Sequence, residues 1–110
     1  MENDVLKLLR ELGVGRTYRG CRIVIISVKL ISDDENRLLN IVDTYKEIAL
    51  RTGTSWRAVE RNIRTVVNRA WVTNQSRLIE VAGYPMSVQP TACEFLEIIY
   101  NYVLRQPVRI

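Results

Sequence analysis

The clearest pattern of apolar and polar positions along the chain lies between residues 56 and 71. Apolar side chains recur there at intervals of three and four residues: Val59, Ile63, Val66, Val67 and Ala70. This spacing places them on one face of an α-helix, where they can pack on a core. The preceding residues 45–52 carry a shorter apolar face, and Gly53 separates the two segments. The pattern therefore predicts two helices joined by a tight turn, which is the outline of a helix-turn-helix.

Two segments that precede this motif are also expected to be helical. Residues 3–12 carry an apolar stripe, with Asn3 or Asp4 as the starting cap and Gly13 at the end. Residues 21–31 are rich in β-branched side chains, which favour a strand. However, no other segment alternates like a pairing strand, and a helical stripe is present: Ile23, Ile26, Ser27 and Leu30. We therefore expect a buried helix over residues 21–31.

A group of acidic residues lies between the second helix and the motif. Ser32 followed three residues later by Glu35 has the spacing of a capping box, which predicts a short helix ending near Val42. Acidic side chains in a first turn also interact favourably with the helix dipole, so we interpret them as structural and not as a metal site. Asp43 or Thr44 is expected to cap the helix that opens the motif.

The chain after residue 71 is expected to contain two more helices. Residues 73–76 are turn-forming, and residues 77–82 would add a short helix before Gly83. The last helix would begin at Pro90 or Thr91. Its apolar stripe has the spacing of three and four residues: Phe95, Ile98, Ile99, Tyr102 and Val103.

Two residues of the last helix lie off this stripe. Tyr100 and Arg105 are expected to pack between protomers, and residues 106–110 are expected to form a frayed tail broken by Pro107. Taken together, the patterns predict one compact all-α domain over residues 1–110, with about six helices and the helix-turn-helix near its middle.

The composition is consistent with a single small domain. The chain has 110 residues, of which 47% are hydrophobic, enough for one core. It contains no run of eighteen apolar residues, so we expect no membrane span. The N-terminal segment MENDVLKLLRELG has acidic residues where a secretory signal has basic ones. These features predict a cytoplasmic location, associated with the nucleoid if the chain binds DNA.

Catalytic chemistry has little support in the sequence. The chain contains no histidine, which removes the commonest general base and any zinc site of the Cys/His type. The glycines at 13, 15 and 20 do not match a phosphate-binding loop. Cys21 and Cys93 are interpreted as small buried hydrophobic residues, with a disulfide or redox role as the alternative. We therefore expect no enzyme activity, no metal and no cofactor.

The positive charge of the chain is concentrated on the motif. Residues 45–77 contain seven basic and two acidic residues, a net charge of +5, whereas the whole chain carries +4. The polar face at 56–71 is opposite the apolar stripe: Arg57, Arg61, Arg64 and Asn68. The simplest interpretation is an ordinary solvated face. The alternative is recognition of DNA, because the planar fork of arginine matches the edge of guanine.

Three more arginines precede or open the second helix. Arg16, Arg19 and Arg22 are interpreted either as part of a solvated loop or as contacts to a DNA backbone. Within the motif, Glu60 lies within reach of Arg64 and Arg57 on a helix surface, so it can hold an arginine in an extended conformation.

The residues of the motif resemble a known family. The stretch AVERNIRTVVNRAW, with YKEIA upstream, resembles the C-terminal DNA-binding effector domain of the stage zero sporulation master response regulator of endospore-forming bacteria. Further matches follow in the same order: Glu11-Leu12-Gly13-Val14, Arg19-Gly20, Gly83-Tyr84, Pro90-Thr91 and Glu94-Phe95. The resemblance covers nearly the whole chain. It implies a cytoplasmic bacterial transcription regulator that binds double-stranded DNA.

The resemblance and the pattern together nominate the residues that would read DNA. The helix at about 55–71 would lie in the major groove, with Arg61 on a guanine and Glu60 on a cytosine amino group. Thr54 and Ser55 would bind a phosphate at the helix N-terminus. The full set of expected DNA-binding residues is Thr54, Ser55, Arg57, Ala58, Glu60, Arg61, Arg64, Thr65 and Asn68.

The resemblance also implies protein partners. In the family, the region after the recognition helix meets the sigma subunit of RNA polymerase, and two domains pair in tandem on DNA. The corresponding polymerase contacts here would be Asn74, Gln75, Arg77 and Glu80. This region is about one residue shorter than the family's and differs from it in sequence, so activation is less well supported than DNA binding.

Two features of the chain leave an alternative function open. The family has an arginine directly before its V-E-R motif, where this chain has Ala58. A chain of 110 residues that begins with Met also has no room for a receiver domain. We therefore expect either an excised effector domain or a small regulator without its own phosphorylation switch. The alternative is a protein-interaction module that keeps the fold but no longer reads an operator.

Overall fold

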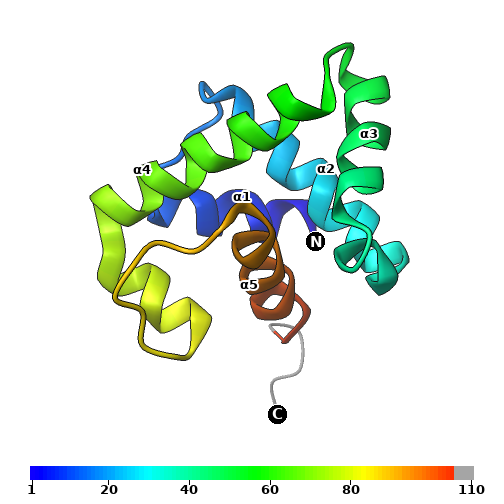
Figure 1. Cartoon of the computed structure of the whole chain (residues 1–110). Coiled ribbons are helices and arrows are strands. Elements are labelled where there is room, and N and C mark those ends of the chain that lie inside the picture. Colours follow the sequence, from blue (N-terminus) through cyan, green and yellow to red (C-terminus); the bar gives the residue numbers. More distant parts are fainter. Residues whose placement is uncertain (106–110) are drawn as a thin grey trace.

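The computed structural model describes residues 1–105 of the chain, and the only regular elements in that range are helices. The five α-helices are connected by short segments and one 3₁₀ helix (Figure 1): α1 (Glu2–Glu11), α2 (Arg19–Asp33), η1 (Glu35–Leu38), α3 (Ile41–Thr52), α4 (Trp56–Ala82) and α5 (Ala92–Arg105). The predicted all-α class is confirmed for the described range. The expected tail at 106–110 lies outside the described residues.

Helix α4 is the longest element and the one on which the others assemble. It packs on α2, α3 and α5, and Figure 1 shows it running along one side of the molecule with α3 at one end. Its predicted apolar stripe is buried in full: Val59, Ile63, Val66, Val67 and Ala70. The apolar stripe predicted within residues 3–12 consists of Val5, Leu8, Leu9 and Leu12, and it is buried in the same core.

Residues 19–33 form a helix and not a strand, as the helical stripe predicted. Ser27 is buried in this helix, where its hydroxyl donates to the Ile23 carbonyl at 2.7 Å and so remains hydrogen-bonded. Near the start of α2, the backbone approaches α4 very closely. A Cβ atom at Gly20 would lie 2.5 Å from the Asn62 carbonyl oxygen and 2.5 Å from a Val66 methyl group. Glycine therefore permits the α2–α4 crossing.

The segment between α2 and α3 differs from the prediction. Ser32 is no N-cap but lies in the last turn of α2, where its hydroxyl donates to the Lys29 carbonyl at 2.7 Å. The Asp34 carboxylate accepts instead from the Asn36 amide at 3.0 Å and opens the 3₁₀ helix. An aspartate that bonds its own nearby backbone favours such a tight turn over a longer helix.

The expected caps of two helices were also wrong. Helix α1 starts at Glu2 after Met1, so Asn3 and Asp4 lie inside its first turn. Helix α3 starts at Ile41, before Thr44. The Thr44 hydroxyl is buried and donates to the Arg37 carbonyl at 3.0 Å, so it ties α3 to the 3₁₀ helix instead of capping α3.

The expected turn at residues 73–76 is reduced to one non-helical residue. Asn74 has φ −150° and ψ 65°, and α4 continues beyond it to Ala82. Its side-chain oxygen accepts from the Arg77 amide at 3.3 Å, as an N-cap does, so the helix restarts immediately. The described range therefore holds five α-helices, one of them kinked, where about six were expected.

Helix α5 begins at Ala92, directly after the predicted Thr91, which caps it. Thr91 and Glu94 form a reciprocal capping box, with amide-to-side-chain distances of 3.1 Å and 2.8 Å. The prediction that Tyr100 packs between protomers was wrong, because this side chain is only 4% exposed and cannot make an external contact. Other helices surround α5 on more than one side, so its buried arc is wider than a single stripe. The side chain of Arg105 lies outside the described atoms.

Candidate nucleic-acid interface

Helices α3 and α4 are joined by a turn of three residues. Gly53 has φ 68°, a left-handed conformation that glycine adopts without strain, and the Thr54 amide donates to the Ala49 carbonyl at 3.0 Å. The Ser55 hydroxyl oxygen then accepts from the Ala58 amide at 3.2 Å and caps α4. The predicted glycine turn is therefore confirmed. Thr54 and Ser55 both carry a hydroxyl that can cap the helix after the turn, and Ser55 is the residue that does so. The turn is short enough to hold the two helices at a defined angle.

The residues expected to bind DNA lie together on the solvent side of the turn and of the first half of α4. Arg57, Arg61 and Arg64 are exposed, and the buried stripe lies on the opposite side of the helix. The other exposed members of the set are Thr54, Ser55, Thr65 and Asn68. Ala58 and Glu60 are half-buried at the two edges of this face. The spacing in the sequence therefore predicted a real, contiguous surface.

The three arginines of this face differ in their internal contacts. Arg57 lies with its guanidinium 5.0 Å from the centre of the Trp56 ring, a contact that the helical spacing does not predict. Arg64 pairs with Glu60 at 3.9 Å, as the helical spacing predicted. Arg61 forms no ion pair or side-chain hydrogen bond with any described residue. Its guanidinium is free to meet an external group.

Other arginines of the basic segment serve the fold. The Arg69 Nε donates to the Gly13 carbonyl at 3.1 Å, and its guanidinium lies 5.7 Å from the Tyr18 ring centre. Arg51 pairs with Glu47 at 2.9 Å. No local pattern predicts the contact of Arg69, because Gly13 is 56 residues away in the chain.

Glu47 also connects α3 to the 3₁₀ helix. Its carboxylate accepts from Arg37 at 2.6 Å as well as from Arg51. The hydrogen bond from Arg37, followed by the charges of both arginines, lowers the pKa of Glu47 below the usual glutamate value. The pair therefore stays ionised at neutral pH and helps to fix α3 next to the turn.

The four expected polymerase contacts divide into two kinds. Gln75 and Glu80 are exposed, as a partner contact requires. Asn74 donates from Nδ2 to the Glu11 carbonyl at 2.9 Å. Arg77 pairs with Glu11 at 2.8 Å, and with Glu80 at 2.6 Å. The structure thus gives Asn74 and Arg77 internal roles in bracing α4 on α1.

Arg77 makes a further contact with α5. Its Nη2 donates to the Tyr102 hydroxyl at 3.0 Å, and its guanidinium lies 5.5 Å from the centre of that ring. The hydrogen bonds to Glu80, Glu11 and Tyr102 raise the pKa of Arg77 above its usual value. This arginine therefore joins α1, α4 and α5.

The described residues offer no metal-binding group of histidine, cysteine, aspartate and glutamate side chains. Cys21 and Cys93 are both free thiols, and burial raises the pKa of each, so they are protonated at neutral pH. Cys21 is buried as expected, whereas Cys93 is half-buried with its thiol 3.7 Å from the Leu38 carbonyl. Across residues 1–105, every helix is too short or too polar to span a bilayer.

Comparison with known families confirms the resemblance seen in the sequence. The family model described as sporulation initiation factor Spo0A, C terminal, matches residues 5–103. No curated protein matches the chain. Because the match covers most of the chain, the chain belongs to the Spo0A C-terminal family. This is a family of DNA-binding effector domains that regulate transcription in sporulation, and it is not a family of enzymes.

Proposed function

From this family membership and the exposed arginine face, we propose that the chain is a sequence-specific transcription regulator whose α3 and α4 act as a helix-turn-helix. The first half of α4 would lie in the major groove, and the chain would act at the nucleoid. The observation that carries the proposal is the position of Arg61. It lies on the exposed face of α4, opposite the buried stripe, and has no internal partner among the described residues.

Each residue of the face has a role that follows from its chemistry. Arg61 would donate to O6 and N7 of a guanine, because its fork is not engaged elsewhere. Glu60 would accept from a cytosine amino group, since its pairing with Arg64 at 3.9 Å is long and solvent-exposed. Arg57 would bind a base or a phosphate, and so would Arg64 once it leaves Glu60.

The remaining residues of the face would position the protein. Thr54 and Ser55 stand at the start of α4, where hydroxyl and amide hydrogens can bind a phosphate. Thr65 and Asn68 continue the exposed face by one turn. Ala58 leaves space at one edge of the face, so the base sequence recognised need not be the box of the sporulation regulator.

The proposal extends to two kinds of protein partner. A second copy of the domain would bind an adjacent box in tandem. The sigma subunit of RNA polymerase would meet the region after the kink through Gln75 and Glu80. Asn74 and Arg77 would shape this surface through their contacts with Glu11.

The test is fluorescence anisotropy with a duplex carrying the sporulation regulator's box and a scrambled duplex, each at two salt concentrations. Arg61→Ala should cost about 1–3 kcal/mol on the preferred site and relax discrimination at one base pair. Lys7→Ala is the matched control, because Lys7 is an exposed cation on α1 beside Tyr102 and Val103. Equal losses for Arg61→Ala on both duplexes would contradict base reading.

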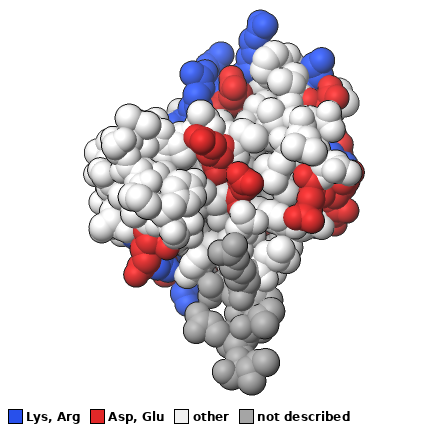
Figure 2. All heavy atoms as spheres, turned by 60° about the horizontal axis from the view of Figure 1, so that its bottom comes forward, with Lys and Arg blue, Asp and Glu red and all other residues white. Residues whose placement is uncertain are grey.

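A different surface favours the alternative of a protein-interaction module. Residues 81–93 contain no charged side chain, and Tyr84 and Val88 are 48% and 73% exposed. Figure 2 shows an uncharged lobe on the side of the molecule where α4 ends. Salt separates the two functions. DNA binding through phosphates weakens steeply as ionic strength rises, because the slope of log K against log salt is about −0.9 per phosphate contact. Binding of a protein to a neutral surface does not weaken in this way.

A further inference from the structure

A groove of about 530 Å³ lies beside the α3–α4 turn. Arg19, Arg22 and Ile23 of α2 form one wall, and residues 51–54 form the other. Three of the lining residues are arginines, and none is acidic. The groove ends at Thr54, directly before the cap of the helix proposed to enter the major groove. We refer to it as the flank groove.

The fold holds the flank groove in a fixed relation to α4. Gly20 packs against the Asn62 carbonyl so closely that a Cβ atom would lie 2.5 Å from it. Arg19 and Arg22 lie one residue before and two residues after this contact, so they are held beside the first half of α4. Both are exposed, and neither forms an ion pair or a side-chain hydrogen bond within residues 1–105. Their charges are therefore available to an external anion.

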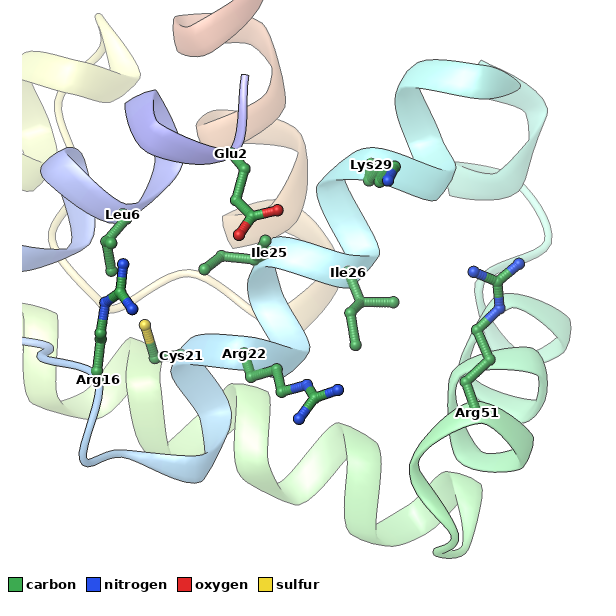
Figure 3. A pocket seen from close by; sticks show the side chains of 9 residues that line it. All are labelled: Glu2, Leu6, Arg16, Cys21, Arg22, Ile25, Ile26, Lys29 and Arg51. Carbon is green, nitrogen blue, oxygen red and sulfur yellow. The ribbon is translucent and has the colours of Figure 1, made fainter.

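A second hollow of about 500 Å³ extends the same basic strip. Arg22 and Arg51 line both hollows, and Arg16 adds another cation (Figure 3). Its apolar lining includes Ile25 and Ile26 of α2. The only acid in its lining is Glu2, at the α1 end. A line of cations therefore runs from the α1–α2 loop to the turn before α4.

The two edges of the exposed face of α4 differ in charge. At about 100° per residue, Ala58 and Asn62 lie on the edge near α2, and Glu60 lies on the other edge. The Gly20 contact confirms that Asn62 faces α2. The edge with Glu60 places a carboxylate next to the exposed face, whereas the α2 edge is followed by the arginines of the flank groove. A polyanion beside α4 would therefore be attracted to the α2 side.

We propose that the flank groove binds the phosphodiester backbone of DNA, on the strand that borders the major groove on the α2 side of α4. This inference rests on the proposed function and adds to it a second element, α2, that positions the protein on the duplex. Arginine forks bind phosphate oxygens bidentately, and such contacts set register without reading bases. Arg19 and Arg22 are the principal contacts, and Arg51 assists while remaining paired with Glu47.

The experiment compares three proteins: the parent, the double variant Arg19→Ala/Arg22→Ala and the control Lys7→Ala. Each is tested on a duplex of random sequence and on a duplex that carries the preferred site of the parent, called the selected duplex. Binding is measured by anisotropy over a range of salt concentrations. Each lost phosphate contact should reduce the slope of log K against log salt by about 0.9, so the double variant should lose nearly 2. The ratio of its affinities for the selected and the random duplex should equal that of the parent. Thermal unfolding of all three proteins checks that the fold is unchanged.

A second arm locates the contact on the DNA. Neutral methylphosphonates replace the phosphates one at a time along each strand of the selected duplex. The parent should lose affinity when the phosphates bordering the α2 side are neutralised, and the double variant should not respond at those positions. The proposal that the flank groove binds DNA would be overturned if the double variant kept the parent's slope of log K against log salt and the parent's response to the methylphosphonates. If Arg61→Ala still relaxes discrimination in that case, the proposed function stands alone. A parent protein without salt-dependent binding to either duplex would overturn both.

Discussion

The first half of α4, residues 56–68, and the second half, which follows Asn74, use arginine in opposite ways. In the first half, Arg57, Arg61 and Arg64 are exposed, with at most one neighbour on the same helix as a partner. In the second half, the Arg77 side chain is only 26% exposed and contacts three helices. The same residue type on one continuous element therefore forms a free surface in one half and an internal brace in the other.

The difference arises from how each half is attached to the rest of the molecule. The first half is held by its apolar stripe and by the close backbone contact at Gly20. The second half also buries Leu78 and Val81. It is held in addition by polar contacts from Asn74 and Arg77 to Glu11. Because Arg57, Arg61 and Arg64 take no part in the attachment of the first half, they are not needed for stability. Charged side chains that the fold does not need are available to bind a partner.

The largest effect is expected from Gly20→Ala, which would disrupt the attachment of the first half. The added methyl group would lie 2.5 Å from the Asn62 carbonyl, and the helices would have to move apart. We expect a loss of about 3 kcal/mol in the free energy of unfolding, although alanine favours a helix. Gly15→Ala is the matched control, because a Cβ there meets nothing within 4 Å. Urea unfolding of both variants is the measurement, and equal stabilities would contradict the close contact.

Arg77→Ala, compared with Arg61→Ala, should show most directly that arginines in the two halves of α4 differ in their contribution to stability. It removes charged hydrogen bonds to Glu11 and Glu80 and leaves the Tyr102 hydroxyl without its donor. We expect a loss of about 2 kcal/mol in the free energy of unfolding, whereas Arg61→Ala should change it by less than about 0.5 kcal/mol. Chemical denaturation of the two variants tests the contrast. A comparable loss of stability in both would show that the free and bracing roles are not distinct.

The smallest of the three effects is expected from Asn74→Ala at the boundary between the halves. Asn74 caps the restarted helix through the Arg77 amide and donates to the Glu11 carbonyl. Loss of this cap should cost about 1 kcal/mol and increase hydrogen exchange of residues 75–82 more than that of residues 56–70. Gln75→Ala is the control, because its side chain is exposed. Uniform exchange along α4 would indicate that the kink does not divide the helix.

Sequence patterns were most reliable where a short-range rule decides the outcome. The exposed and buried faces of residues 56–71, the turn at Gly53 and the start of the last helix next to Thr91 all follow from contacts within about one turn. A helix over residues 21–31 was predicted against its β-branched composition, because a helical stripe was present and no partner strand was available, and the structure extends that helix to residues 19–33. The patterns failed at Ser32 and Asn74, where several local side-chain hydrogen bonds compete and tertiary packing selects among them.

The sequence by itself determined the helical class, the family and the face on which the DNA-reading candidates lie, because helical periodicity is a property of neighbouring residues. Only the tertiary structure decided which arginines are free. Arg69 and Arg77 meet partners 56 and 66 residues away, and the Gly20 contact holds Arg19 and Arg22 beside α4. Such contacts depend on how the helices pack, and no local spacing encodes them.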